Sequence, residues 1–186
     1  MKLQALLLLP VLALAWPGST FATDYNVRPE LSRLGFHGTY QGATFNGNFS
    51  QWTAAISYDP ADLAHSSFDV TVNMASAKTG DHDQDHALPG SSFFDVLKSP
   101  TAHFVTTGFH HDGKMLIADG QLTLRGVTKP MSLSVMWRSQ ANGNASLDVT
   151  GHLNRLDFGV GSGDYADTSV ISNQVKVTAH LQLAPK

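Results

Sequence analysis

Regular alternation of apolar and polar residues is the feature that most constrains this chain. Between residues 67 and 75 every second residue is apolar, and the same alternation returns in 131–137, 147–153 and 175–183. Successive side chains of a strand point to opposite faces, so a period of two gives each segment one apolar and one polar face. Helical periodicity is scarce. We therefore expect an all-β fold.

Further strand candidates are separated by turn residues. These candidates are the segments 34–40, 43–49, 54–58, 101–109 and 114–124. The turn signals are Asn46-Gly47, Asp59-Pro60, Asp112-Gly113 and Asn142-Gly143, and the last two are typical of hairpins. We expect about eight or nine antiparallel strands, one short helix at Ser92–Leu97 and one short turn at Pro60–Leu63.

An antiparallel sheet with one apolar face must bury that face against a second sheet or by closing on itself. Closure also removes the unpaired edges of the sheet. Long candidate strands at 114–124 and 145–155 favour a barrel, and an eight-stranded barrel has room for one small ligand. A two-layer sandwich stays open as the alternative, because alternation alone does not separate the two folds.

The first 22 residues predict a secretory signal peptide. Lys2 precedes an apolar run that ends at Trp16, and a helix-breaking Pro-Gly pair and small residues follow it. This run is shorter than the roughly 20 apolar residues of a membrane anchor, so we expect cleavage after Ala22 rather than retention as an anchor. The chain then consists of a signal peptide, 1–22, and one domain, 23–186.

Composition excludes several classes of function. The chain has no cysteine, which rules out disulfides, thiol catalysis and thiolate metal sites. The formal net charge is −3 and the Lys and Arg residues are scattered, so the basic stripe of a nucleic-acid-binding protein is missing. We therefore expect no nucleic acid partner.

Several motifs resemble those of one family. The segment 120–130 resembles the G-x-L-T-x-x-G-V-T-[KR]-P motif of YceI-like proteins, and 155–161 is similar to their R-x-D-F-G-x-G element. Residues 85–96 and 100–104 resemble the D-x-x-L, F-F-D and P-x-A-x-F run of that family. Matches at 32–36, 47–49 and Asp59-Pro60 extend the resemblance, in the same order, over essentially the whole domain.

The resemblance to YceI-like proteins implies a lipocalin-like antiparallel barrel in the bacterial periplasm that holds a polyprenyl chain or isoprenoid quinone in an elongated internal cavity. It implies a binding protein without catalytic activity and without a cofactor other than that lipid. Transient membrane contact and a monomeric or homodimeric state agree with such a role. One motif departs from the family: where its central R-D-x-H-L version has Arg and His, this chain has Gln84 and Ala87.

Inward-facing residues of the expected strands supply the candidate lipid-binding site. They are Phe36, Phe45, Phe49, Phe68, Val70, Val72, Phe104, Leu122, Leu124, Leu133, Val135, Leu147, Val149, Val175 and Val177, together with Arg155 at the end of an apolar row. Apolar residues of this kind line a lumen or simply fill it as core. The Arg155 guanidinium would meet a phosphate or quinone oxygen, or pair with a carboxylate such as Asp157 or Asp167.

Two other functions remain open at this stage. His82, Asp85 and His86 lie in an acidic segment that we expect to be a polar loop, and imidazole and carboxylate groups there would serve a small metal-dependent enzyme. The sequence lacks a recognisable nucleophile motif, a phosphate loop and H-E-x-x-H. The third possibility is a solidly packed barrel that acts as an interaction module.

Overall fold

The structure is a computed structural model that describes residues 22–186, so all but the last residue of the predicted signal peptide lie outside the described part. No helix in this part is long and apolar enough to cross a membrane. Its strands are β1 (Thr23–Val27), β2 (Arg33–Tyr40), β3 (Ala43–Phe49), β4 (Trp52–Tyr58), β5 (Ser67–Asn73), β6 (Ala77–Lys78), β7 (Thr101–Asp112), β8 (Met115–Leu124), β9 (Val127–Ser139), β10 (Ala145–Asn154) and β11 (Gln174–Pro185). The helices are α1 (His82–Ala87) and six 3-10 turns, η1 (Pro29–Leu31), η2 (Leu63–His65), η3 (Met74–Ser76), η4 (Ala141–Gly143), η5 (Arg155–Phe158) and η6 (Gly163–Tyr165).

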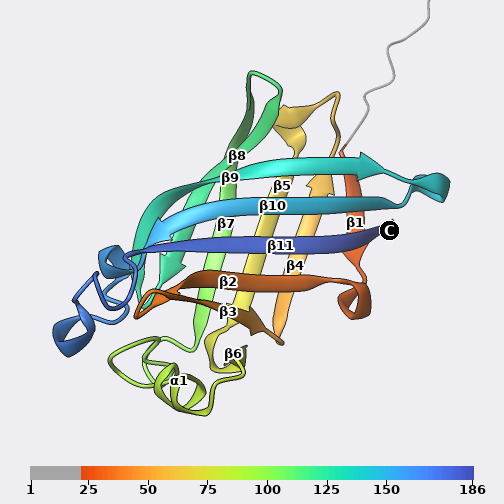
Figure 1. Cartoon of the computed structure of the whole chain (residues 1–186). Coiled ribbons are helices and arrows are strands. Elements are labelled where there is room, and N and C mark those ends of the chain that lie inside the picture. The colour runs from red at the N-terminus through yellow and green to blue at the C-terminus, as the bar shows by residue number, and fades with distance from the viewer. Residues whose placement is uncertain (1–21) are drawn as a thin grey trace, which may run out of the picture.

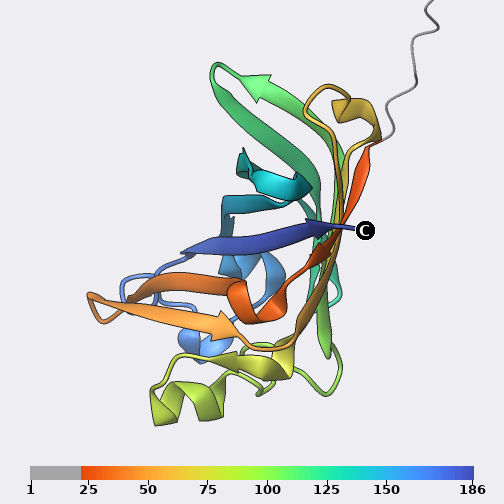
Figure 2. The ribbon, with the colours of Figure 1, turned by 90° about the vertical axis from the view of Figure 1, so that its right-hand side faces the viewer.

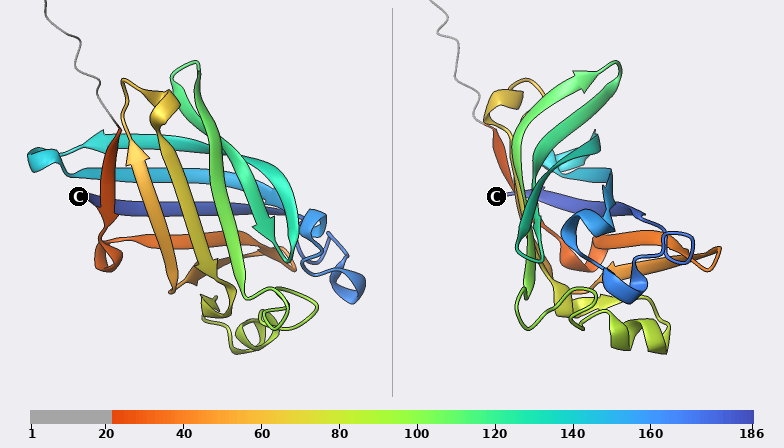
Figure 3. Two further views of the ribbon diagram at one scale, coloured as in Figure 1. Left: turned by 180° about the vertical axis from the view of Figure 1, so that it is seen from behind. Right: turned by 90° about the vertical axis from the view of Figure 1, so that its left-hand side faces the viewer.

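The short strand β1 closes the sheet into an antiparallel barrel. Its first residues pair with β4 (Thr23 with Tyr58) and its last residues pair with β11 (Val27 with Leu183). The ring runs β1, β4, β5, β7, β8, β9, β10, β11 and back to β1. In Figures 1 and 3, the strands β9, β10 and β11 cross β4, β5 and β7 at a steep angle, as two sides of one flattened barrel.

A second group of strands extends from the edge of β11 that also pairs with β1. Residues 176–180 of β11 pair with β2, β2 pairs with β3, and β3 meets β6 through Asn48 and Phe49. In this sheet, β3 and β4 do not pair with each other. One end of the barrel is therefore closed by β1, and beside the other end lie the β2–β3 hairpin, α1 and the loop between β10 and β11, which project to the same side of the molecule (Figure 2).

These findings confirm the all-β barrel and most of the predicted strands. The sandwich alternative is wrong, because β1 pairs with both β4 and β11 and leaves no gap between two layers at that end. The turns at Asp112-Gly113 and Asn142-Gly143 connect β7 to β8 and β9 to β10, as expected. The strands β1 and β6 were not predicted, since one is short and polar and the other has two residues.

Three local predictions are wrong. Asn46-Gly47 lies inside β3, and the hairpin turns instead at Gln41-Gly42, which have the positive φ values of 51° and 79° that tight hairpins require. Residues 92–97 form turns, whereas the segment expected to be a polar loop is the helix α1. Asp81 starts this helix, because its carboxylate accepts hydrogen bonds from the backbone N–H groups of Asp83 (3.1 Å) and Gln84 (2.9 Å).

Aromatic side chains fill the end of the barrel that β1 closes. The rings of Tyr58 and Trp137 lie 4.4 Å apart, and Tyr25 meets Trp137 edge-on at 5.0 Å. Phe68 and Phe109 extend this cluster with a T-shaped contact at 5.0 Å. Edge-to-face pairs of this kind add stability beyond the area that they bury. The closed end is thus a packed core.

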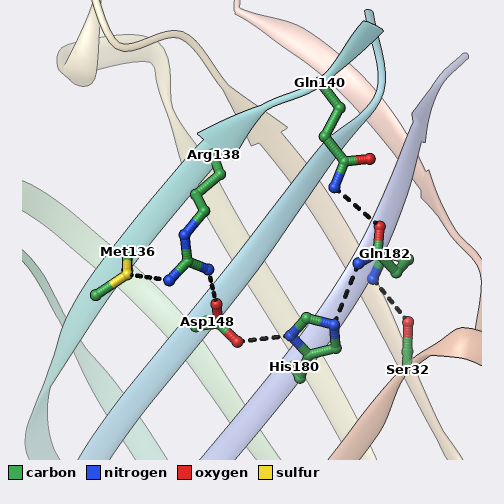
Figure 4. A network of polar contacts seen from close by, with 7 residues as sticks. All are labelled: Ser32, Met136, Arg138, Gln140, Asp148, His180 and Gln182. Atoms are coloured by element: carbon green, nitrogen blue, oxygen red, sulfur yellow. Dashed lines mark hydrogen bonds and ion pairs between the residues drawn. The ribbon is translucent and has the colours of Figure 1, made fainter.

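A polar network ties the outer faces of β9, β10 and β11 together (Figure 4). The Asp148 carboxylate contacts Arg138 with one oxygen, and its other oxygen lies 2.6 Å from Nδ1 of His180. The backbone N–H of Gln182 donates to Oγ of Ser32 at 2.9 Å. Partial burial acts to raise the pKa of Asp148, but the hydrogen bonds and charges of His180 and Arg138 outweigh it and hold the pKa below its ordinary value.

Replacing Asp148 with Asn should produce a pH-dependent loss of stability. The folded-state pKa of Asp148 lies below its unfolded value of about 3.9, so its contribution is present above pH 4 and is lost as the pH falls through the folded pKa. Because these groups are partly exposed, we expect a difference of about 0.2–1 kcal/mol at pH 7. Urea unfolding of both proteins at pH 7 and pH 3 measures it. A difference that does not shrink at pH 3 would contradict this account.

Candidate ligand-binding cavity

The inner faces of the strands enclose a cavity of about 600 Å³, which lies within the range of typical ligand pockets. Its walls are mostly apolar side chains from both sides of the barrel. The predicted residues that line it are Phe36, Phe45, Phe49, Phe68, Val70, Val72, Phe104, Leu122, Leu124, Leu133, Leu147, Val149, Arg155, Val175 and Val177. The barrel is therefore hollow over part of its length, and a solidly packed interior is the wrong description.

Val135 is the predicted wall residue that does not line the cavity. It lies on β9 opposite Leu116 and Val149, is buried, and belongs to the core cluster that also contains Tyr58. Leu133, two residues earlier on the same face, does line the cavity. The transition from packed core to open lumen thus falls between these two positions of β9.

Four phenylalanines form one wall near the open end. The centre of the Phe36 ring lies 5.0 Å from that of Phe49, 6.2 Å from that of Phe45 and 6.3 Å from that of Phe94. A side chain at Gly47 would collide with Phe36, because a Cβ there would lie 2.1 Å from its ring. The glycine in β3 therefore lets the Phe36 ring lie against the sheet instead of across the lumen.

Some lining residues escaped the sequence analysis. Trp52, Ile56, Met131 and Leu181 lie on strand faces whose alternation makes them detectable. The same is not true of Phe93, Tyr165 and Ile171, which come from loops without any period. These loop residues contribute to the open end, where the rings of Phe93 and Tyr165 contact each other in a tilted arrangement with centres 4.9 Å apart.

Arg155 lies at the cavity but pairs with neither of the two carboxylates named in the sequence analysis. Its guanidinium donates hydrogen bonds to five backbone carbonyls of the following loop: those of Val160, Gly161, Tyr165, Ile171 and Ser172, at 2.6–3.1 Å. The residue is only 3% exposed, and burial lowers its pKa, although an arginine stays protonated at neutral pH. It makes no ion pair with Asp157 or Asp167. Its role in the structure is to hold the loop 160–172 in place.

The helix α1 borders the open end of the cavity with polar groups. Thr79, Asp81, Asp83 and Gln84 are part of the lining, and we call these four residues the rim. Asp85 turns away from the lumen toward Thr79, whose backbone N–H and hydroxyl donate to its carboxylate at 2.6 and 3.0 Å. The first of these bonds is the main reason why the pKa of Asp85 is lowered.

The metal-site hypothesis receives no support from this geometry. His82 and His86 do lie one helical turn apart, but the Asp85 carboxylate is engaged by Thr79. The ring of His82 contacts only Asp83, at 3.2 Å, and both side chains are almost fully exposed. Across residues 22–186, no group of three or more His, Asp or Glu side chains is arranged to hold a metal ion.

Known proteins resemble this chain over most of its length. A "UPF0312 protein" of Pseudomonas savastanoi pv. phaseolicola is 31% identical over 166 residues, which cover 84% of this chain and 86% of the relative. Burkholderia cenocepacia BcnA has a similar structure, with a TM-score of 0.79, 26% identity, and coverage of 84% of this chain and 99% of BcnA.

A polyisoprenoid binding domain from Saccharophagus degradans shares the fold at 14% identity, with a TM-score of 0.63 and coverage of 89% of this chain and 99% of that domain. Residues 25–183 match the YceI-like domain family, from within β1 to Leu183 in β11. The chain belongs to the YceI-like domain family.

Proposed function

We propose that this protein is a binding protein, not an enzyme, and that it holds a long isoprenoid-type lipid, a polyprenyl chain or an isoprenoid quinone, in its barrel. The observation that carries this proposal is the 600 Å³ cavity with its nearly continuous apolar wall. The shared fold of the S. degradans protein, a polyisoprenoid binding domain, supports it.

The chemistry of the wall accounts for binding without reactive groups. Each CH₂ group that leaves water for such a wall contributes about 0.8 kcal/mol. Branched and unsaturated chains fit among Phe, Leu and Val side chains, and no polar contact is needed along their length. Affinity should therefore rise with the length of chain that the cavity accommodates.

Export to the periplasm is part of the proposal. The pattern of residues 1–22 supports it, and β1 begins at Thr23, so removal of the signal peptide would leave all described strands in place. N-terminal sequencing of protein from a periplasmic extract should give Thr23 as the first residue. Recovery of unprocessed chain in the membrane fraction would contradict export as a free protein.

Lipid extraction tests the main proposal. The purified protein is incubated with neutral phosphatidylcholine vesicles that contain a long-chain polyprenol, separated from the vesicles, and extracted with organic solvent for mass spectrometry. We expect polyprenol in near-equimolar amount and little phosphatidylcholine. Protein that emerges empty, or with phosphatidylcholine alone, would overturn the proposed function.

Substituting Leu124 with Trp should displace the lipid without unfolding the barrel. Leu124 is buried on β8 and lines the cavity, so the larger ring takes space that at least two CH₂ groups of the ligand would fill. At about 0.8 kcal/mol per CH₂, polyprenol affinity should fall about tenfold or more. Ser134→Trp on the exposed face of β9 is the matched control. Equal retention of polyprenol in both variants would remove Leu124 from the binding wall.

Substituting Arg155 with Lys should destabilise the loop 160–172 at the open end of the cavity. An ammonium group cannot reach all five carbonyls, and buried carbonyls left without donors cost about 1–3 kcal/mol. We expect faster hydrogen exchange in residues 160–172, a lower free energy of unfolding and faster release of polyprenol. Arg138→Lys, on the outer face, should leave exchange in this loop unchanged.

A further inference from the structure

The rim gives the open end of the cavity a negative charge. Asp81 and Asp83 lie in the polar part of the lining with Thr79 and Gln84, just before and within the first turn of α1. One oxygen of Asp81 caps the helix, and the side chain of Asp83 is 97% exposed. A ligand whose tail fills the cavity would place its polar end beside these two carboxylates.

The described cavity lining offers a ligand no Lys or Arg side chain with a free hydrogen-bond donor. Among the described lining residues, Arg155 is the one Lys or Arg, and its five N–H donors are all taken by backbone carbonyls. Two other cations, Lys78 and Arg125, lie outside the cavity lining. Lys78 lies 4.0 Å from Asp85, and Arg125 donates to the carbonyls of Phe93 and Gly159 at 2.7 and 2.6 Å.

Two sequence positions strengthen this view of the rim. Gln84 and Ala87 occupy the places where the central R-D-x-H-L motif has Arg and His, and both line the cavity. The amide of Gln84 donates and accepts hydrogen bonds but carries no charge. Besides the rim carboxylates, the polar lining thus includes the Gln84 amide, the hydroxyls of Tyr40, Thr79 and Tyr165 and the imidazole of His103, and it holds no Lys or Arg with a free donor.

We propose that the cavity selects isoprenoid lipids with an uncharged polar end, a hydroxyl or a carbonyl, and rejects the phosphorylated form of the same chain. This inference rests on the proposed function and narrows its ligand class. A hydroxyl can donate to a rim carboxylate or to the Gln84 amide oxygen. A phosphate monoester, with a charge of about −1.5 to −2 at neutral pH, is repelled by Asp81 and Asp83 and meets no Lys or Arg with a free donor among the described lining residues.

The size of the discrimination follows from the exposure of the rim. The rim carboxylates face solvent, so repulsion acts through a high dielectric and is screened over about 8 Å at 0.15 M salt. We expect the phosphate to bind about fivefold to tenfold more weakly than the alcohol at this salt concentration. The ratio should increase at low salt, whereas the affinity of the alcohol should stay constant.

The test compares a polyprenol with the polyprenyl monophosphate of identical chain length. Both are presented in the same uncharged detergent at pH 7.5, and binding is measured by native mass spectrometry and by competition. Asp81→Asn/Asp83→Asn, in which Asn still caps the helix, should reduce the discrimination. The control Asp24→Asn/Asp112→Asn removes the same charge at exposed positions outside the cavity and should leave the discrimination unchanged.

A gain-of-function variant completes the test. Gln84→Arg should raise phosphate affinity several-fold and leave polyprenol affinity nearly unchanged, whereas Gln140→Arg, at an exposed position just after β9, should alter neither. Phosphate binding as tight as or tighter than alcohol binding in the natural protein would overturn the inference and leave the proposed function standing. Binding of neither lipid would overturn both.

Discussion

The pairing of β1 with two strands is the interaction on which the rest of the structure depends. Tyr25 lies in both ladders, opposite Ile56 of β4 and Pro185 of β11. Because β1 has only five residues, it joins the two sides of the barrel at one end only. At the other end the β2–β3 hairpin extends the sheet without reaching β4. A short strand thus produces a barrel with one closed and one open end.

Side-chain size then decides which part of this barrel is filled. Tyr25, Tyr58 and Trp137 meet at the closed end and leave no room for a ligand there. Toward the open end the large rings lie along the wall, as Phe36 does over Gly47. One pattern of inward apolar residues therefore gives a core in one layer and a pocket wall in the next. The cavity requires both the packed core at one end and the open layer beside it, because a barrel open at both ends would admit water along its whole length.

This division between packed core and pocket wall explains which features of the barrel the sequence could predict. The period of two assigned inward faces correctly, because it follows from backbone geometry alone. The alternation could not show that Leu133 lines the cavity and Val135 does not, because the packing around each residue depends on cross-strand neighbours such as Leu116. The helix α1 was missed because its capping residue Asp81 lies in a run of polar residues that also suits a loop. The carbonyl partners of Arg155 come from a loop without periodicity, so no sequence pattern could predict them.

Arg155 shows why the position of a charge does not by itself reveal its function. A guanidinium at the end of an apolar row suggests contact with an anionic head group, yet here five carbonyls saturate its donors and it stabilises the loop instead. The groups that we propose meet the polar end of a ligand are instead those of the rim, before and within α1. The apolar surface that a lipid tail buries along the wall increases with the length of the tail, and it is the same whatever the head group is. Under the proposed function, affinity and head-group selection reside in separate elements, so we expect substitutions at the rim to change the ligand while the barrel stays the same.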